Sequence, residues 1–350
     1  MSNNVVGLML IDAPHSALNN AGKDASERTD NTVRVKSIWK KGVRYPYVSG
    51  QALRYWLRET LKEKFDWKMS PIFRKDKIAF TAVNPIDFDD DDVFGYMRAI
   101  KGNSEKGTFV YVDNEEMITE DVKFKKDDSV TRISPFKNSP LVSVVGQNPT
   151  NDFGVMARHD GDPVPYEHEF YSTILKGIFS IDLESLGVFC ESEKTGYRNM
   201  YPKLIELAKE KGLTHEEDYW MLDEETRIKR AQDIINALPY LSGGAKNTSH
   251  LTDVTPKILV LAAIDGGNHI FMNIVREENG ETVFDIDALD EVINEYSGIL
   301  KTDVFIGLRS GFLKDTQDKI IAYAKEQDNV QVGTIKEITD KFSEEIPELI

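Results

Sequence analysis

The chain has 350 residues, of which 40% are hydrophobic and 29% are charged, and its formal net charge is −16. This composition is ordinary for a globular protein, and the length allows two domains or one domain with large insertions. The acidic total argues against loose binding to any nucleic acid, because non-specific affinity comes mostly from neutralising phosphates. It leaves room for a single basic groove on an otherwise negative body.

Cysteine content and apolar runs bear on where the protein works. The single cysteine, Cys190, excludes an internal disulfide and suits a reducing compartment. The longest purely apolar run, Ile258–Ile264, is far too short to span a bilayer. The first residues lack the basic segment that precedes the apolar part of a secretory signal. We therefore expect a cytoplasmic protein with no membrane partner.

The N-terminal part separates its charges. Val5–Asp12 predicts a first strand, and the polar stretch 13–31 predicts a long loop. The next segment, Val33–Phe65, has nine basic residues against two acidic ones and carries +7, so the rest of the chain carries −23. Such segregation gives an anion a defined place to bind.

The basic segment has clear local signals. Val33–Trp39 and Val43–Val48 predict extended strands, and Ser49 predicts the N-cap of a helix that ends near Phe65. The expected buried stripe of this helix consists of Leu53, Trp56, Leu57, Thr60 and Leu61.

Two interpretations of this helix stay open. Arg54, Arg58 and Lys62 follow one another at intervals of four on a neighbouring face. With free N–H groups at the helix start, Ser49, Gln51 and Arg54 would form a phosphate cradle. The alternative is an ordinary amphipathic helix with a solvated basic edge.

Candidate metal and cofactor motifs are weak. The acid cluster Asp87–Asp92 predicts the solvated start of a helix over Val93–Ile100, where acids favour the helix dipole. It lacks the spaced ligands of a calcium loop. The six histidines are not at metal-ligand spacing, and His159–Asp162 is typical of a turn. We expect no metal, no cofactor and no catalytic residue.

The remaining chain predicts strands and helices interrupted by insertions. We expect a peripheral insertion at about 66–130, a proline-rich, hairpin-like excursion at about 131–171 and a helical insertion at about 195–240. The Gly-rich loop Ser242–Lys246 lacks the spacing of a nucleotide-binding P-loop. Lys257–Asp265 is the most apolar strand and is expected to be central. Together these elements predict one α+β domain with insertions.

Five stretches, in order, resemble the DevR-type backbone subunit of type I-B CRISPR Cascade complexes, a member of the RAMP superfamily. The most specific stretch is RYPYVSGQALRYWLRETL, Arg44–Leu61. The others are His15–Asp24, Thr131–Val144, Asn151–Tyr171 and Pro239–Gly267. They cover most of residues 1–270, whereas the segment from Asp285 onward matches no motif of the family.

The resemblance implies a modified ferredoxin-like (RRM-type) palm with a helical finger insertion and a β-hairpin-like thumb. It also implies that the helix start faces the backbone of the crRNA without reading its sequence, because the guide's spacer varies. The glycines of the loop at 242–246 would let backbone N–H groups approach a phosphate. The candidate RNA-binding residues outside the thumb are Lys36, Lys40, Arg44, Ser49, Gln51, Arg54, Arg58, Gly243, Gly244 and Lys246.

The thumb of the resembling family folds over guide and target and displaces one base at regular intervals. Phe153 and Met156 are the candidates for this wedge, and Arg158 is a candidate phosphate contact. The alternative is that Phe153 and Met156 only pack the hairpin.

The resulting expectation is a non-catalytic subunit that polymerises along one crRNA and holds it for pairing with target DNA in antiviral defence. Its partners would be the crRNA, further copies of itself and other Cascade subunits. One alternative is a type III-like subunit that cleaves target RNA with Asp24 or Asp30. Against it, Ser49–Arg54 departs from the Pro-Gly-Ser-Ser-Leu-Lys pattern of that type. A third possibility is a stand-alone RNA-binding regulator.

Overall fold

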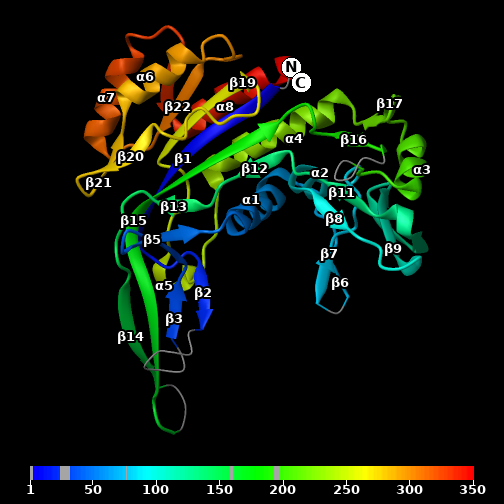
Figure 1. Ribbon diagram of the computed structural model, residues 1–350, viewed down its shortest axis with the longest axis horizontal. Coiled ribbons are helices and arrows are strands. Elements are labelled where there is room, and N and C mark those ends of the chain that lie inside the picture. The colour runs from blue at the N-terminus through cyan, green and yellow to red at the C-terminus, as the bar shows by residue number, and fades with distance from the viewer. Residues whose placement is uncertain (1–2, 24–31, 76, 158–160, 193–197) are drawn as a thin grey trace.

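A computed structural model describes residues 3–23, 32–75, 77–157, 161–192 and 198–350. The fold is mixed α+β, with one large sheet, several helices and a long hairpin that projects from the body (Figure 1). This confirms the expected α+β class. The finer expectation of a ferredoxin-like palm stays a prediction.

The large sheet is built around two long antiparallel strands, β1 (Asn3–Ser16) and β15 (Val164–Asp182). Along its main path the strand order is β23 (Val330–Thr334), β22 (Val304–Leu308), β19 (Ile258–Asp265), β1, β15, β13 (Leu141–Ser143), β5 (Val43–Val48) and β4 (Ser37–Lys40). Off this path lie β12 (Phe136–Asn138), β14 (Thr150–Met156), β3 (Thr32–Val35) and β2 (Asn20–Lys23). The apolar strand β19 is central, as expected.

Strand β1 supplies both faces of the sheet through its period of two. Val5 and Met9 belong to one buried cluster, and Val6 and Leu8 belong to a second. Gly7 lies between Val5 and Met9 along the strand. Any larger residue would clash there, because a Cβ at this position would stand 2.3 Å from the ring of Phe179 on β15. The sheet is therefore covered on both faces.

Helices of distant sequence origin build these two clusters. The first contains residues of α1 (Gly50–Phe65), α4 (Glu224–Ala237) and α8 (Ile335–Glu345). The second contains residues of α6 (Ile286–Glu295) and α7 (Lys314–Ala324). No helix in the described part of the chain is long and apolar enough to cross a membrane.

Helix α1 matches its sequence-based prediction closely. Ser49 is the N-cap, and its Oγ accepts a hydrogen bond from the backbone N–H of Ala52 at 3.3 Å. The helix ends at Phe65, and its buried residues are the five of the predicted stripe. Local signals were sufficient here because capping and periodicity act within a few residues.

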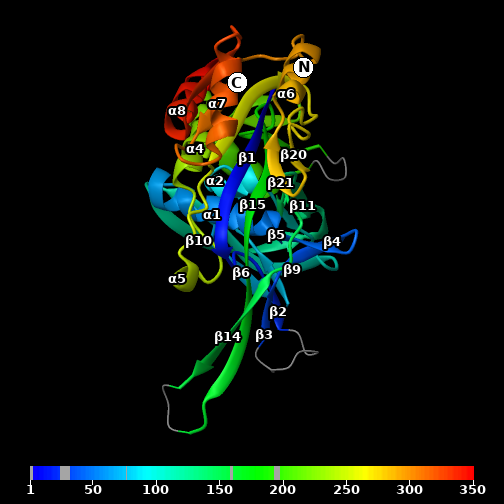
Figure 2. The same ribbon diagram turned by 90° about the vertical axis from the view of Figure 1, so that its left-hand side faces the viewer.

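Strand β15 belongs to the sheet and to the projecting hairpin at once. Its C-terminal part pairs with β1, and its N-terminal part pairs with β14, from Phe170 opposite Thr150 to Val164 opposite Met156. Figures 1 and 2 show this hairpin extending well away from the body. It lies within the excursion expected at 131–171.

A third buried cluster combines residues from 83–130 with residues from 189–222. Its elements are β8 (Tyr96–Arg98), β9 (Ser104–Asp113), β10 (Glu116–Lys125), β11 (Val130–Arg132), β16 (Val188–Cys190), α3 (Pro202–Glu210), β17 (Thr214–Glu216) and β18 (Tyr219–Met221). Cys190 is buried beside this cluster. We call this unit the finger.

Several smaller elements complete the fold. They are β6 (Phe73–Lys75), β7 (Ile78–Phe80), α2 (Asp89–Phe94), α5 (Asn247–His250), β20 (Val275–Glu278), β21 (Glu281–Phe284) and 3₁₀ turns at Lys126–Asp128, Leu238–Tyr240 and Ile346–Glu348.

The acid cluster before the finger differs from its prediction. The expected helix over Val93–Ile100 is wrong: α2 ends at Phe94, and the chain continues into strand β8. Gly95 causes the break, because its φ is 70° and a Cβ there would lie 2.4 Å from the carbonyl oxygen of Arg132. Asp90, Asp91 and Asp92 are buried, so the prediction of a solvated cluster is also wrong.

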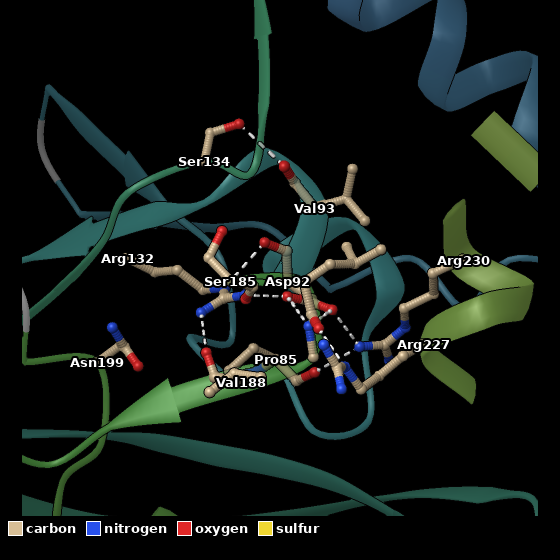
Figure 3. A network of polar contacts seen from close by, with 12 residues as sticks. Pro85, Asp92, Val93, Arg132, Ser134, Ser185, Val188, Asn199, Arg227 and Arg230 are labelled. Carbon is tan, nitrogen blue, oxygen red and sulfur yellow. Dashed lines mark hydrogen bonds and ion pairs between the residues drawn. The ribbon is translucent and has the colours of Figure 1, made fainter. Parts of the chain in front are cut away.

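The partners of Asp92 explain how a carboxylate of this cluster can be buried (Figure 3). Its carboxylate pairs with Arg132 on β11 and accepts a hydrogen bond from Nη1 of Arg230 on α4 at 2.6 Å. It also accepts the backbone N–H of Gly187 at 3.0 Å. A carboxylate is stable in the interior only when it is paired and hydrogen-bonded in this way.

Asp90 is less well compensated and gives the first prediction. It accepts the N–H of Ser70 at 2.8 Å, and its nearest cation, Nε of Arg58, is 3.9 Å away. Burial, reinforced by the charge of Asp91, raises the pKa of Asp90 to about 7. The folded chain therefore holds this proton more tightly than the unfolded chain does. The stabilisation is complete below the ordinary pKa of 3.8 and is lost as pH rises through about 7.

Asp90→Asn keeps the acceptor for Ser70 and removes the titration. We expect the unfolding free energy of the variant, relative to that of the native protein, to rise by about 1 kcal/mol or more between about pH 5 and about pH 8. Urea denaturation at the two pH values measures this. Asp113→Asn, at an exposed position, is the control and is expected to have the same small effect at both. An Asp90→Asn effect that does not change with pH would contradict the assignment.

Candidate nucleic-acid interface

The β4–β5 hairpin at the edge of the sheet is one exposed part of the basic segment. Trp39 is 69% exposed, and Lys40 and Lys41 are also exposed. The Nζ of Lys40 lies 5.8 Å from the centroid of the Tyr45 ring. Lysines beside an exposed aromatic ring suit a phosphate backbone with a stackable base. Sequence reasoning did not select Trp39 as a site residue, although an aromatic residue next to two lysines was a usable signal.

Arg44, by contrast, is committed to the fold. Its guanidinium binds the carboxylate of Glu169 through two hydrogen bonds of 2.6 and 2.9 Å, and Nη2 also donates to Ser37 Oγ at 3.2 Å. Glu169 is buried and accepts the backbone N–H of Val35 as well. The pair therefore joins strands β3, β5 and β15, and it neutralises the positive charge of Arg44.

Arg54 is anchored still more firmly. Nε donates to Asn138 Oδ1 at 2.7 Å, and Nη2 donates to the carbonyl oxygen of Phe136 at 2.8 Å. Nη1 donates to the carbonyl oxygen of Phe94 and to Ser134 Oγ. Burial lowers the pKa of Arg54. The guanidinium thus connects α1 to the segment around β12, and it does so through four hydrogen bonds to other parts of the same chain.

Arg58 and Lys62, the next basic residues at intervals of four on α1, differ in their exposure. The Arg58 guanidinium carbon lies 4.2 Å from the centroid of the Phe94 ring, and burial lowers the pKa of Arg58. Lys62, one turn later, is exposed. The regular spacing of Arg54, Arg58 and Lys62 therefore does not produce one basic face, because tertiary partners draw the two arginines inward.

At the start of α1 some polar groups already have partners within the chain, and others are exposed. The Ser49 hydroxyl caps the helix, while its backbone N–H donates to Asn19 Oδ1 at 3.0 Å. Gln51, in the first turn, is exposed. Lys36, in the link between β3 and β4, is half-buried, and its backbone N–H donates to the carbonyl oxygen of Asn19. Lys36, Ser49 and Asn19 are therefore close together.

The Gly-rich loop packs against this region. Gly243 has a φ of 153°, and a Cβ there would lie 2.2 Å from the indole of Trp56 on α1. A Cβ at Gly244, where φ is 108°, would lie 2.6 Å from Leu18. The backbone N–H of Ala245 donates to the carbonyl oxygen of Leu18 at 2.9 Å. Gly243 is thus required for packing against α1, and Gly244 for packing against Leu18.

After the loop the chain reaches the base of the projecting hairpin. The His168 and His250 rings have centroids 5.7 Å apart, and Tyr166 stacks on His168. Burial, followed by the charge of Lys246, lowers the pKa of His168. Lys246 therefore lies close to the hairpin base, where sequence reasoning had not placed it.

The candidate wedge residues lie on the hairpin itself. Phe153 is 63% exposed and Met156 is 55% exposed, so neither is held against the body. Arg158, Asp24 and Asp30 lie outside the described residues. Within the described ranges, no group of three or more His, Cys, Asp or Glu residues is placed to hold a metal ion.

Comparison with protein families gives one match, described as CRISPR-associated negative auto-regulator DevR/Csa2, over residues 13–279. The chain belongs to the DevR/Csa2 family. The matched range includes the basic segment, the projecting hairpin and the Gly-rich loop, and it ends before α6. No sequence among the curated proteins matches the chain.

Two of the solved structures similar to this DevR/Csa2 family member are chains of CRISPR surveillance complexes. A chain of a "CRISPR RNA-guided surveillance complex, pre-nicking" superposes with a TM-score of 0.52 at 11% identity, covering 98% of this chain and 100% of the other. A chain of a "CRISPR RNA-guided surveillance complex" has a TM-score of 0.48 at 10% identity, covering 97% and 98%. The first of these shows a common fold.

The internal hydrogen bonds of Arg54 yield a second prediction. Arg54→Met keeps the aliphatic stem and removes the bonds to Asn138, Ser134 and two carbonyl groups, so we expect a loss of about 2–4 kcal/mol in the free energy of unfolding. Gln51→Ala, in the same first turns but exposed, is the control and is expected to stay within about 0.5 kcal/mol. Urea denaturation measures both. Native stability in Arg54→Met would show that the guanidinium serves a ligand rather than the fold.

Proposed function

We propose that this DevR/Csa2 family member is a crRNA-binding backbone subunit of a type I-B CRISPR surveillance complex. Family membership supports a role in CRISPR systems, and the fold shared with a chain of an RNA-guided surveillance complex supports a place in such an assembly. In this proposal several copies bind one crRNA, contact other subunits of the complex, and hold the guide for pairing with target DNA in antiviral defence.

The observation that carries the RNA-binding role is the distribution of positive charge. The +7 segment lies in a chain of −16, and two of its exposed cations, Lys40 and Lys41, lie on the β4–β5 hairpin beside the exposed Trp39. A lysine ammonium is a point charge that contacts phosphate without the paired donors with which arginine reads a guanine edge. Such a surface can follow a guide of any sequence.

Assembly along the guide follows from the same charge distribution. Copies that repeat along a linear RNA need a head-to-tail contact that does not close into a ring. The acidic remainder of each copy opposes self-association until RNA neutralises the basic hairpin. The projecting hairpin β14–β15, with Phe153 and Met156 exposed, supplies the apolar wedge in this proposal.

The hairpin lysines are the third test. Lys40→Glu with Lys41→Glu is expected to weaken binding of single-stranded RNA and to reduce the slope of log affinity against log salt by roughly 1.4, about 0.7 for each phosphate that is no longer neutralised. Lys62→Glu with Lys64→Glu makes the same charge change at exposed positions near the end of α1 and is the control. Fluorescence anisotropy at several salt concentrations measures both. Equal losses of affinity in the two double variants would mean that net charge, and not the hairpin, governs binding.

We also propose that the subunit is a scaffold and not a nuclease. The competing role needs Asp24 or Asp30 to position a divalent ion at a phosphate of the target. We expect protein loaded with guide RNA to leave a complementary RNA intact in Mg²⁺ or Mn²⁺, with no change in Asp24→Ala or Asp30→Ala. Denaturing gels of end-labelled target give the answer. Regularly spaced cuts that disappear in either variant would establish the nuclease instead.

A further inference from the structure

Two buried arginines of the finger differ in a way that points to a second binding site. Arg98 on β8 and Arg132 on β11 lie on paired strands, and both are almost inaccessible, with side chains 4% and 2% exposed. Each guanidinium covers an aromatic ring: Arg98 lies 3.6 Å from the centroid of Phe124, and Arg132 lies 4.7 Å from that of Phe189. Their surroundings are therefore alike in burial and in aromatic contact.

The two guanidinium groups differ in their hydrogen bonds. All three guanidinium nitrogens of Arg132 donate, to Asp92, Val188 and Ser185. In Arg98, Nε, Nη1 and Nη2 have no hydrogen-bond partner in the described part of the chain. The carboxylate of Glu105 stands 3.6 Å from Nη2 of Arg98, which is an ion pair longer than a well-formed hydrogen bond. Unsatisfied buried donors destabilise a fold, so Arg98 requires an explanation that Arg132 does not.

A cavity lies beside Arg98. It has a volume of about 390 Å³ and lies among β7, β8 and the start of β9, with Ile78, Phe80, Met97, Lys101 and Glu105 among its lining residues. This size is that of a small-molecule site. Met97 is 72% exposed and Ile78 is 52% exposed. Ile78 and Phe80 come from β7, and the β6–β7 hairpin projects from the body (Figure 1).

We propose that this cavity binds a small organic acid, with its carboxylate on Arg98 and Lys101 and its apolar body against Phe80, Met97 and Ile78. This goes beyond the proposed crRNA-binding function and does not depend on it. The planar fork of a guanidinium matches a carboxylate, and both hydrogen bonds and charge would then satisfy Arg98.

Charge and shape favour a carboxylate over RNA. Arg98 and Lys101 are the cations among the described lining residues, and a carboxylate that displaces Glu105 would compensate their positive charge. A nucleic-acid strand would bring further phosphates onto apolar walls. The surrounding strands β9 and β10, Ser104–Asp113 and Glu116–Lys125, carry more acidic than basic residues.

Glu105 is the residue that a ligand would have to displace to reach Arg98. It lines the cavity, its side chain is 18% exposed, and it holds Arg98 only at ion-pair distance. The acid would take the place of the Glu105 carboxylate and form the hydrogen bonds to Arg98 that Glu105 does not form. Glu105→Gln, which weakens this competition, is therefore expected to tighten binding.

Stability separates a binding role from a structural one. Removing a buried, unsatisfied cation relieves a cost, so Arg98→Met is expected to keep or raise the melting temperature. Arg132→Met is the matched control and is expected to lower it by about 5 °C or more, because it removes one of the two arginines that pair with the buried Asp92 and leaves only Arg230. A comparable fall in Arg98→Met would show that Arg98 serves the fold, and would overturn the proposal.

Binding is tested on the full chain with 1-naphthoate as the probe and its neutral analogue 1-naphthalenemethanol as the control. With methyl-¹³C methionine, the Met97 signal, assigned through Met97→Leu, reports on the cavity by NMR. We expect a saturable shift with naphthoate, at least about tenfold weaker binding of the neutral analogue, and a loss of affinity of at least about tenfold in Arg98→Met.

Lys101→Gln provides a second variant at an exposed position, and it is expected to weaken naphthoate binding without changing stability. Equal affinity for the acid and the neutral analogue, or unchanged naphthoate affinity in both Arg98→Met and Lys101→Gln, would mean non-specific apolar contact. A Met97 shift with single-stranded RNA and none with naphthoate would assign the cavity to nucleic acid. Any of these results would overturn the proposal.

Discussion

The buried carboxylate of Asp92 is the interaction on which the junction of finger and sheet depends. It joins α2, strand β11 through Arg132, the turn at Gly187 and helix α4 through Arg230. Arg230 extends the network through a 2.8 Å bond to Asp89. Because α4 also packs in the core beneath the large sheet, this one charge connects two hydrophobic clusters that share no buried residues. Such a network fixes one relative arrangement, since a partial loss leaves a buried charge uncompensated.

The same distinction between satisfied and unsatisfied cations runs through the molecule. Arg44, Arg54 and Arg132 have rigid, multidentate partners and hold elements together. The exposed lysines, among them Lys40 and Lys41 of the β4–β5 hairpin, carry charge that remains for a ligand. A count of basic residues therefore overestimates the positive charge that is available to a ligand, because part of the +7 is neutralised inside the fold. The neutralised residues are arginines, whose planar guanidinium can form several hydrogen bonds to internal partners.

Strand β15 links the candidate interface to the core. The same strand carries the projecting hairpin, accepts Arg44 through Glu169 and pairs with β1 in the centre of the sheet. The hairpin strand is thereby joined to the basic segment through a buried ion pair. The His168–His250 contact places α5 and Lys246 at the same junction. The thumb-like hairpin, the Gly-rich loop and the helix start thus meet although they are far apart in the chain.

The sequence alone determined the α+β class, the family, the cap and buried stripe of α1, and the central place of β19. These features follow from capping, periodicity and apolar runs, which act over a few residues or along one element. It also located the projecting hairpin, because prolines and the absence of helix signals mark such an excursion.

Only the tertiary structure decided which charged side chains are available. The regular row of Arg54, Arg58 and Lys62 predicted one basic face, but Asn138, Phe94 and carbonyl groups far along the chain capture the two arginines. The aspartates at 90–92 predicted a solvated helix start, yet arginines 40 and 138 residues away pair with Asp92 in the interior. Whether a charge faces water or a partner depends on contacts distant in sequence, and local patterns do not encode those contacts.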